Sequence, residues 1–249
     1  MTLPLVILPG LHGGSKLLDR FSDRLPDWIA PRVVTYPTDR IITYDDILAG
    51  LELPDAPFAL LAESYSGPLG VRIAASRPTN LRALVLTATF ARSPHPWFPR
   101  WAAGAARAWM FRLPIQQHAC RRLLLNDDGS CEQLDEGWRE LVRADPDVLA
   151  ARIREVLRVD VRRLLPEIQV PTFYLQASRD RVVPGWALRD IRQRLPQIES
   201  VTLDSPHPIL QRRAAKSAAA IADFLQRATI PHSSAATPSI RTPEYSAHE

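Results

Sequence analysis

The chain has 249 residues, of which 46% are hydrophobic and 23% charged, and its formal net charge is +4. This composition is typical of an ordinary globular protein and excludes a disordered or fibrous chain. The length permits one large domain or a core with one sizeable insertion, and it excludes a long chimera. The 31 basic residues are interleaved with 27 acidic ones, so the sequence does not support a nucleic-acid partner.

The N-terminal segment has no basic leader, and prolines interrupt its apolar run well short of signal-peptide length. No run elsewhere approaches the 18 or more apolar residues that a membrane span requires. Only two cysteines occur, Cys120 and Cys131, and they predict neither a disulfide framework nor a metal site. We therefore expect a cytoplasmic protein without a membrane span.

Six short apolar runs, bounded by Pro, Asp, Gly or Ser, predict strands that are buried on both faces. They cover residues 3–8, 32–36, 58–62, 84–87, 172–175 and 198–203. Stretches with helical spacing lie between them, for example behind Ser15 and from about 68 to 75. Because strands alternate with helices, we expect an α/β fold with a doubly wound, mostly parallel sheet of about six strands.

Residues 91–165 interrupt this alternation with helical patterns alone. One helix is expected behind Asp145-Pro146, a cap followed by a proline in the first turn. The interval contains six of the eighteen aromatic residues, and thirteen basic against ten acidic residues. We interpret it as a helical lid inserted into the α/β domain.

The C-terminal part predicts one amphipathic helix after Pro208, followed by a segment without apolar periodicity. From about residue 228 onwards, Ser, Thr, Pro and Ala predominate, and such a segment buries too little surface to offset its chain entropy. The expected organisation is therefore one domain over 1–227, with the lid at about 91–165, and a disordered tail over 228–249.

A serine, Ser64, stands where the predicted buried strand 58–62 gives way to a helix. Small residues flank it at Ala62, Ser66 and Gly67, as a tight strand-to-helix turn requires. Such a turn aims the hydroxyl into the cleft beyond the strand ends, with a helix amino terminus behind it. Ser66 is a rival nucleophile, but Pro68 would then occupy a position that the turn wants small.

Two possible partners follow later strands. Asp180 lies in the loop after the predicted strand 172–175, and His207 lies between the last strand and the last helix. Because each of the three residues stands at a strand end, their side chains can meet as a triad at one edge of the sheet. In it, His207 would take the proton of the Ser64 hydroxyl, and Asp180 would fix the imidazole tautomer.

These residues resemble the nucleophile elbow and triad of the α/β-hydrolase fold, and the resemblance covers roughly residues 3–227. The usual Gly-x-Ser-x-Gly appears here as Ala62-Glu63-Ser64-Tyr65-Ser66, a small-for-small replacement. The resemblance to compact bacterial carboxylesterases implies a two-step acyl transfer. It also implies an oxyanion hole formed by the backbone N–H groups of Leu11 and Tyr65, with His12 as the alternative to Leu11.

The aromatic lid favours a small or medium-sized apolar or aromatic acyl group, for which Trp97, Trp101 and Trp109 are the candidate binding residues. The expected substrate is thus a small-molecule ester. The chain is also similar to carrier-protein methyl esterases, and the arginine excess in the lid would suit an acidic acyl-carrier protein as partner.

Other functions remain open at this point. An acyltransferase or a C–C hydrolase could use the same triad, and the fold also serves non-catalytic ligand receptors. No His-Glu-x-x-His run, Cys/His cluster or Gly-x-Gly-x-x-Gly after the first strand occurs, so neither a metal nor a dinucleotide cofactor is expected.

Overall fold

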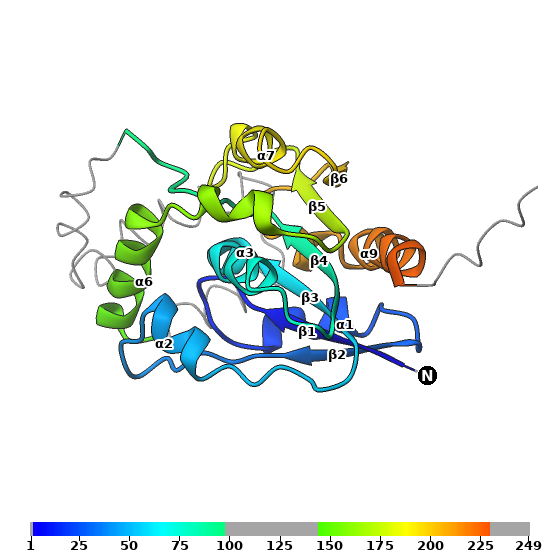
Figure 1. Ribbon diagram of the computed structural model, residues 1–249. Helices are drawn as coiled ribbons and strands as arrows, with labels where there is room; N and C mark the ends of the chain where they lie inside the picture. Colours follow the sequence, from blue (N-terminus) through cyan, green and yellow to red (C-terminus); the bar gives the residue numbers. More distant parts are fainter. Residues whose placement is uncertain (1, 98–143, 230–249) are drawn as a thin grey trace, which may run out of the picture.

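The computed structural model describes residues 2–97 and 144–229, which form a six-stranded sheet with helices on both faces. The strand order is β2-β1-β3-β4-β5-β6, and every neighbouring pair is parallel. The strands are β1 (Leu3–Leu8), β2 (Ile29–Val33), β3 (Phe58–Glu63), β4 (Leu81–Thr87), β5 (Thr172–Ala177) and β6 (Glu199–Leu203). Figure 1 shows the sheet from β2 at the bottom to β6 at the top.

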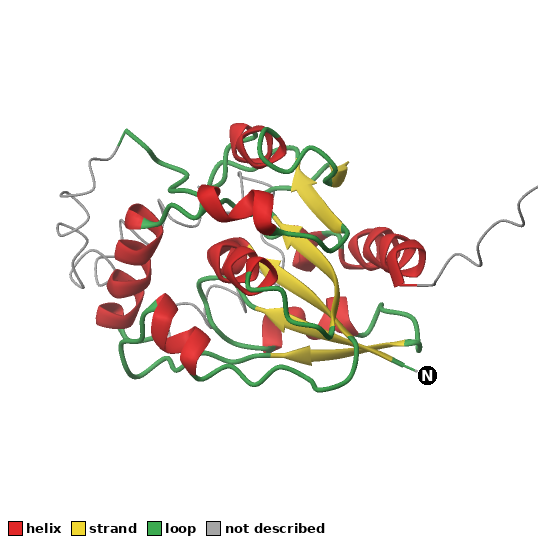
Figure 2. Ribbon diagram, in the orientation of Figure 1, coloured by secondary structure: helices red, strands yellow, loops and turns green. Residues whose placement is uncertain are grey.

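All six strands therefore end at the same edge of the sheet, as their arrowheads show in Figure 2. In an open parallel sheet, the loops at this edge form the crevice in which ligands bind. The predicted fold class, a parallel α/β sheet of about six strands, is confirmed.

Alternate residues of the central strands pack against two separate layers of helices. In β3, Leu60 and Ala62 face one hydrophobic cluster, whereas Ala59 and Leu61 face the other. The first cluster includes residues of α2 (Tyr44–Ala49), α3 (Gly67–Ala75), the 3-10 helix η5 (Arg162–Glu167) and α7 (Trp186–Arg192). The second includes residues of the 3-10 helix η1 (Lys16–Leu18), α1 (Asp19–Ser22), α8 (Ile209–Arg212) and α9 (Ala214–Thr229).

The second strand lies three residues earlier than the apolar run at 32–36 predicts. It is an edge strand that pairs only with β1, and most of its residues are exposed. An edge strand is not buried on both faces, so a continuous apolar run does not mark it, and it tolerates Pro31. The buried Tyr36 at the end of the run belongs to the following loop.

The single helix predicted after Pro208 is two helices, α8 and α9. The backbone leaves the helical region at Arg213, which has φ −127° and ψ 37°. The apolar positions continue through both helices, from Ile209 to Leu225, and therefore did not reveal the break. α9 ends at Thr229, two residues beyond the predicted end of the domain.

The two ends of the predicted lid lie side by side. Arg92 and Asp160 form an isolated antiparallel bridge, and the N–H of Ser93 donates to the carbonyl of Val159. The returning chain forms α6 (Pro146–Arg158), whose cap residue Asp145 accepts from the N–H of Asp147, as the sequence predicts. Residues 98–143, with Trp101 and Trp109, and the expected tail from 230 onwards lie outside the described residues.

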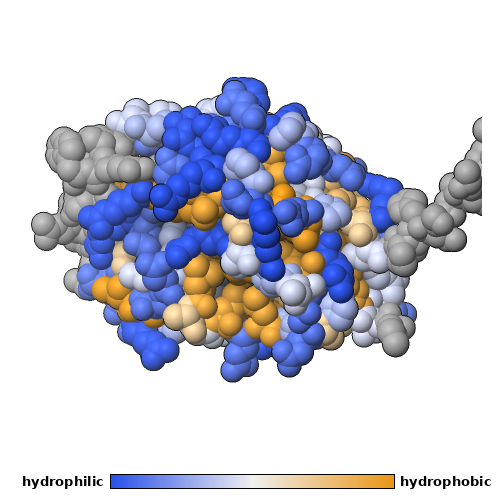
Figure 3. Space-filling view, in the orientation of Figure 1, coloured by the Kyte–Doolittle hydropathy of each residue, from blue (hydrophilic) through white to orange (hydrophobic). Residues whose placement is uncertain are grey.

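The face seen in Figure 3 is largely hydrophilic, with apolar residues gathered in the lower middle of the view. Within residues 2–97 and 144–229, three large hydrophobic side chains are exposed, those of Ile41, Trp97 and Val201. None of the helices in these two ranges combines the length and the apolar character that spanning a bilayer requires.

Candidate active site

Ser64 occupies a sharp turn between β3 and α3. Its φ is 47°, in the left-handed region that non-glycine residues rarely adopt. Residues 64–66 form one 3-10 turn, and α3 begins at Gly67. The Thr89 hydroxyl donates to the Ser64 carbonyl and holds this backbone in place. Backbone strain of this kind is held by its surroundings and clusters at functional sites.

The small residues around Ser64 allow the strand and the helix to approach closely. A β-carbon on Gly70 would lie only 2.7 Å from the Ala62 β-carbon, and one on Gly67 only 1.8 Å from the Thr89 hydroxyl oxygen. Gly70 and Gly67 therefore have no room for a side chain while Ala62 and Thr89 keep their places, which is a steric reason for small residues around the predicted elbow.

The structure brings Ser64, His207 and Asp180 together. The Ser64 Oγ lies 2.8 Å from the His207 Nε2, and the His207 Nδ1 lies 2.7 Å from the Asp180 Oδ2. The three residues follow β3, β6 and β5, so the common edge of the parallel sheet brings them together. Ser64 and His207 are 143 residues apart along the chain, so their contact depends on the tertiary structure alone.

Asp180 is fixed on both carboxylate oxygens. Its Oδ1 accepts from the N–H groups of Val182 and Val183, both at 2.8 Å, which leaves Oδ2 for His207. A carboxylate on Nδ1 places the ring proton there, so the His207 Nε2 is an acceptor for the Ser64 hydroxyl proton. The chain of contacts can thus move a proton from Ser64 to His207.

The surroundings of His207 favour its protonated form. Burial lowers the pKa of His207, but the charge and hydrogen bond of Asp180, together with the charge of Glu63, outweigh burial and raise it above its ordinary value. An imidazole with these neighbours is a stronger base than a solvated one.

Ser66 has other partners. Its hydroxyl is fully buried, lies 2.8 Å from the Tyr36 hydroxyl and donates to the Pro9 carbonyl. These contacts tie the start of α3 to the loop after β1. It is therefore the Ser64 hydroxyl that contacts His207, whereas the Ser66 hydroxyl bridges Tyr36 and Pro9.

The loop after β1 carries the other predicted oxyanion donor. Gly13 has φ 74°, and its N–H donates to the Gly10 carbonyl, which turns the chain around Leu11 and His12. Among the described residues, neither the Leu11 N–H nor the His12 N–H has an acceptor. Tyr65 lies in the first turn of a helix, where N–H groups lack an intrahelical partner. These N–H groups are thus available to a ligand.

Two charged side chains at this site had no role in the sequence prediction. Glu63 is 6% exposed and Arg152 only 1% exposed. The Arg152 guanidinium donates to the carbonyls of Leu11 at 2.6 Å and Pro37 at 2.8 Å, so that α6 holds the loop after β1. A charged residue in the otherwise apolar run of β3 is a signal that could have identified Glu63, whereas the amphipathic pattern of α6 contains none for Arg152.

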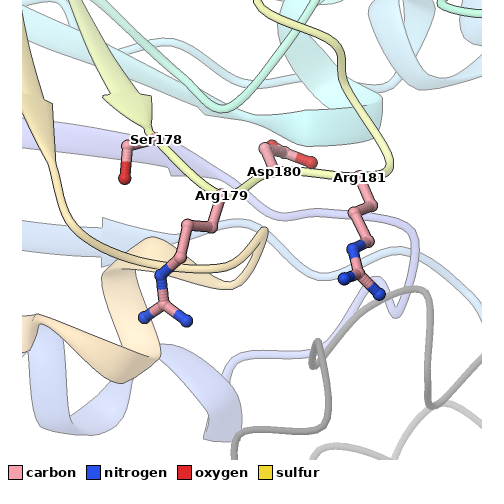
Figure 4. A pocket seen from close by; sticks show the side chains of 4 residues that line it. All are labelled: Ser178, Arg179, Asp180 and Arg181. Atoms are coloured by element: carbon pink, nitrogen blue, oxygen red, sulfur yellow. The ribbon is translucent and has the colours of Figure 1, made fainter.

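A pocket of about 340 Å³ opens beside the loop after β5, which carries Asp180. Its lining residues are Ser178, Arg179, Asp180 and Arg181. Figure 4 shows the guanidinium groups of Arg179 and Arg181 on the same side of this loop. Arg179 pairs with Asp204 at 2.6 Å. Along the sequence, Asp180 is thus flanked by Arg179 and Arg181.

Trp97, the one predicted substrate-binding tryptophan among the described residues, is 64% exposed, and its ring meets the His95 ring edge-on. The same residues, 2–97 and 144–229, contain no group of three or more His, Cys, Asp or Glu side chains that could hold a metal ion.

The parallel sheet, the strained serine turn and the order of the strands define an α/β-hydrolase-fold protein. Residues 31–204 match the family model for the serine aminopeptidases of type S33, and the chain belongs to this family.

The known proteins that resemble this chain include esterases and an enol-lactonase. A pimeloyl-[acyl-carrier protein] methyl ester esterase from Neisseria meningitidis is 28% identical over 199 residues, which cover 76% of each chain. Among solved structures, the enol-lactonase from Burkholderia xenovorans has a TM-score of 0.76 at 20% identity, with 91% of this chain and 92% of that chain covered. An esterase from Thermogutta terrifontis has a TM-score of 0.74 at 19% identity, with 92% and 91% covered. At these identities, the two structures show the shared fold.

Proposed function

We propose that this protein hydrolyses carboxylic esters through an acyl-enzyme intermediate on Ser64. The observation that carries the proposal is the chain of contacts from the Ser64 hydroxyl through His207 to Asp180, with links of 2.8 and 2.7 Å. A nucleophile within hydrogen-bond reach of a base that a third group orients is the signature of covalent acyl transfer.

In the first half-reaction, the Ser64 Oγ attacks the ester carbonyl carbon, and His207 takes the hydroxyl proton. The negative charge that develops on the carbonyl oxygen is stabilised by the N–H groups of Leu11 and Tyr65. The tetrahedral intermediate then collapses, the bond to the alkoxy group breaks, and His207 returns its proton to the leaving alcohol.

In the second half-reaction, His207 removes a proton from water, and the resulting hydroxide attacks the acyl carbon. The bond to the Ser64 Oγ breaks, the acid leaves, and the proton on His207 returns to Ser64. Asp180 stabilises the imidazolium that forms in each half-reaction.

For the substrate, we favour an ester with a small or medium-sized apolar acyl group, with Trp97, Trp101 and Trp109 as the binding residues. The names of the Neisseria relatives support a second element, an acyl-carrier protein as the group that presents the ester. Thirteen basic against ten acidic residues in the segment 91–165 suit such an acidic partner.

The decisive experiment compares Ser64→Ala with Ser66→Ala on a short p-nitrophenyl ester. Loss of the Ser64 hydroxyl should lower kcat by about 10⁴-fold or more, because the acyl-enzyme can no longer form. Ser66→Ala is the matched control, since it removes the neighbouring hydroxyl but leaves the His207 contact. Activity that survives Ser64→Ala would reject the proposal.

Two further measurements separate this function from others. A fluorophosphonate probe should label Ser64, and failure to label would favour a non-catalytic receptor. An aminoacyl p-nitroanilide tests the peptidase activity that the family description names. We expect the ester to be the better substrate by kcat/KM.

A further inference from the structure

Glu63 is a buried carboxylate directly beside the proposed nucleophile. It is the last residue of β3, and its side chain is 7% exposed. A buried carboxylate is costly unless hydrogen bonds and charges compensate it. Glu63 is therefore held by specific partners, and the identity of those partners indicates what it does.

The partners come from a loop and from a helix. The Glu63 Oε2 accepts from the Gly10 N–H at 3.2 Å, and its Oε1 accepts from the Gln211 side-chain amide at 2.9 Å. Gly10 directly precedes Leu11, whereas Gln211 lies on α8, four residues after His207. One carboxylate thus connects the segments that carry the nucleophile, the proposed oxyanion donor and the proposed base.

The ring of His12 also faces this carboxylate, with its Nε2 at 3.7 Å from the Glu63 Oε2. The His12 Nδ1 accepts from the Gly14 N–H at 3.0 Å, so it carries no proton. The His12 Nε2 thus lies beside the carboxylate but beyond hydrogen-bond distance of it.

We propose that Glu63 is a positioning residue. It holds the loop after β1, at Gly10, and the helix after His207, α8, in fixed geometry around Ser64. The proposal rests on the ester hydrolysis described above. Its charge also acts on the base: the charges of Asp180, from the loop after β5, and of Glu63, from β3, both raise the pKa of His207. Two carboxylates thus stabilise the imidazolium that forms when Ser64 loses its proton.

The test is Glu63→Gln, which keeps the shape but leaves one accepting oxygen for two donors, Gly10 and Gln211. We expect kcat on a p-nitrophenyl ester to fall by about 10- to 100-fold, less than the loss from removing an oxyanion donor outright. KM should change by less than about threefold. The acid limb of the kcat/KM profile should move down by about 0.5 pH unit, because one anion near His207 is gone.

The double variant Glu63→Gln/Gln211→Glu exchanges the two groups, so that the amide at 63 can donate to the carboxylate at 211 while its oxygen accepts from Gly10. On a logarithmic scale, this double variant should recover at least about half of the decrease in kcat. The matched control is Glu52→Gln, in which an 89% exposed carboxylate is neutralised and kcat should stay unchanged. If Glu63→Gln fails to fold, Gln211→Ala, which removes one donor, should lower kcat by about three- to tenfold.

The proposal would be overturned if Glu63→Gln left both kcat and the acid limb of the kcat/KM profile unchanged. It would also be overturned if kcat fell, the double variant did not recover it, and the acid limb stayed in place. A readout independent of esters is the downfield Nδ1 proton resonance of His207, titrated in the full chain. If the wild-type protein hydrolyses no ester but Glu63→Gln lowers the midpoint of this titration, the proposed function fails and the action of Glu63 on His207 stands. An unmoved midpoint counts against that action whatever the ester result.

Discussion

Gly67 packs against Thr89 so closely that a β-carbon on Gly67 would lie 1.8 Å from the Thr89 hydroxyl oxygen. Thr89 in turn donates to the Ser64 carbonyl. The turn that presents Ser64 therefore depends on a glycine three residues later and on a threonine after the next strand.

Gly67→Ala should destabilise the protein by about 1 to 3 kcal/mol, because the new methyl group forces Thr89 and the turn apart. The melting temperature should fall by about 2 to 10 °C, as measured by circular dichroism. Gly50→Ala is the control, since the nearest atom to its β-carbon is 3.5 Å away. An equal melting temperature for the wild type and Gly67→Ala would mean that the turn adjusts freely.

The pH dependence of the activity should reflect the neighbours of His207. The ring must be neutral to take a proton, so kcat/KM rises with pH as His207 deprotonates. Burial lowers the pKa of His207, but Asp180 and Glu63 outweigh burial and raise it, so the half-maximal rate should lie above about pH 6.5. The stability that this group contributes has the opposite trend: it is complete below the unfolded pKa and is lost as pH rises through the folded one.

Asp180→Asn should move the half-maximal rate to lower pH and reduce kcat by about 10⁴-fold, because the imidazolium loses its nearest anion and the tautomer is no longer held. The check is a pH–rate profile on a p-nitrophenyl ester from pH 5 to 9. An acid limb that stays in place in Asp180→Asn would show that another group titrates.

Arg152→Met should disturb the loop after β1 from the side of α6. The carbonyls of Leu11 and Pro37 lose charged donors, so we expect a loss of about 2 to 4 kcal/mol in urea unfolding and a lower kcat. Arg158→Met removes an exposed arginine from the same helix and should cost less than about 1 kcal/mol. If the two variants are equally stable, the contacts of Arg152 contribute little.

Asp190 connects α7 to both ends of the inserted segment. Its buried carboxylate lies 3.0 Å from Arg92 and Arg194 and 3.7 Å from Arg162. Asp190→Asn should lower the free energy of unfolding by about 1 to 3 kcal/mol, less than for fully buried pairs, because the three arginines are partly solvated.

The comparison variant for this prediction is Asp223→Asn, whose carboxylate is 71% exposed and pairs with Arg227. It should change the free energy of unfolding by less than about 1 kcal/mol. Both values come from the same thermal or urea unfolding series. A larger effect at the exposed pair than at Asp190 would contradict the expected importance of burial.

The sequence by itself determined the fold class and the order of Ser64, Asp180 and His207 at three strand ends. Central strands of a parallel sheet are buried on both faces, and this leaves continuous apolar runs that can be recognised locally. The edge strand β2 was misplaced because it is not buried on both faces and has no continuous apolar run. The break at Arg213 was missed because the apolar pattern continues through it.

Only the tertiary structure decided which serine meets His207 and how the site is supported. Glu63 meets Gln211 across 148 residues, and Arg152 meets Leu11 across 141. Such contacts depend on how the crossovers place distant loops at one edge of the sheet, and a local pattern of apolar and polar residues carries no information about that. Periodicity indicates which side of an element is buried, whereas the partner of a buried charge is known only when the chain has folded.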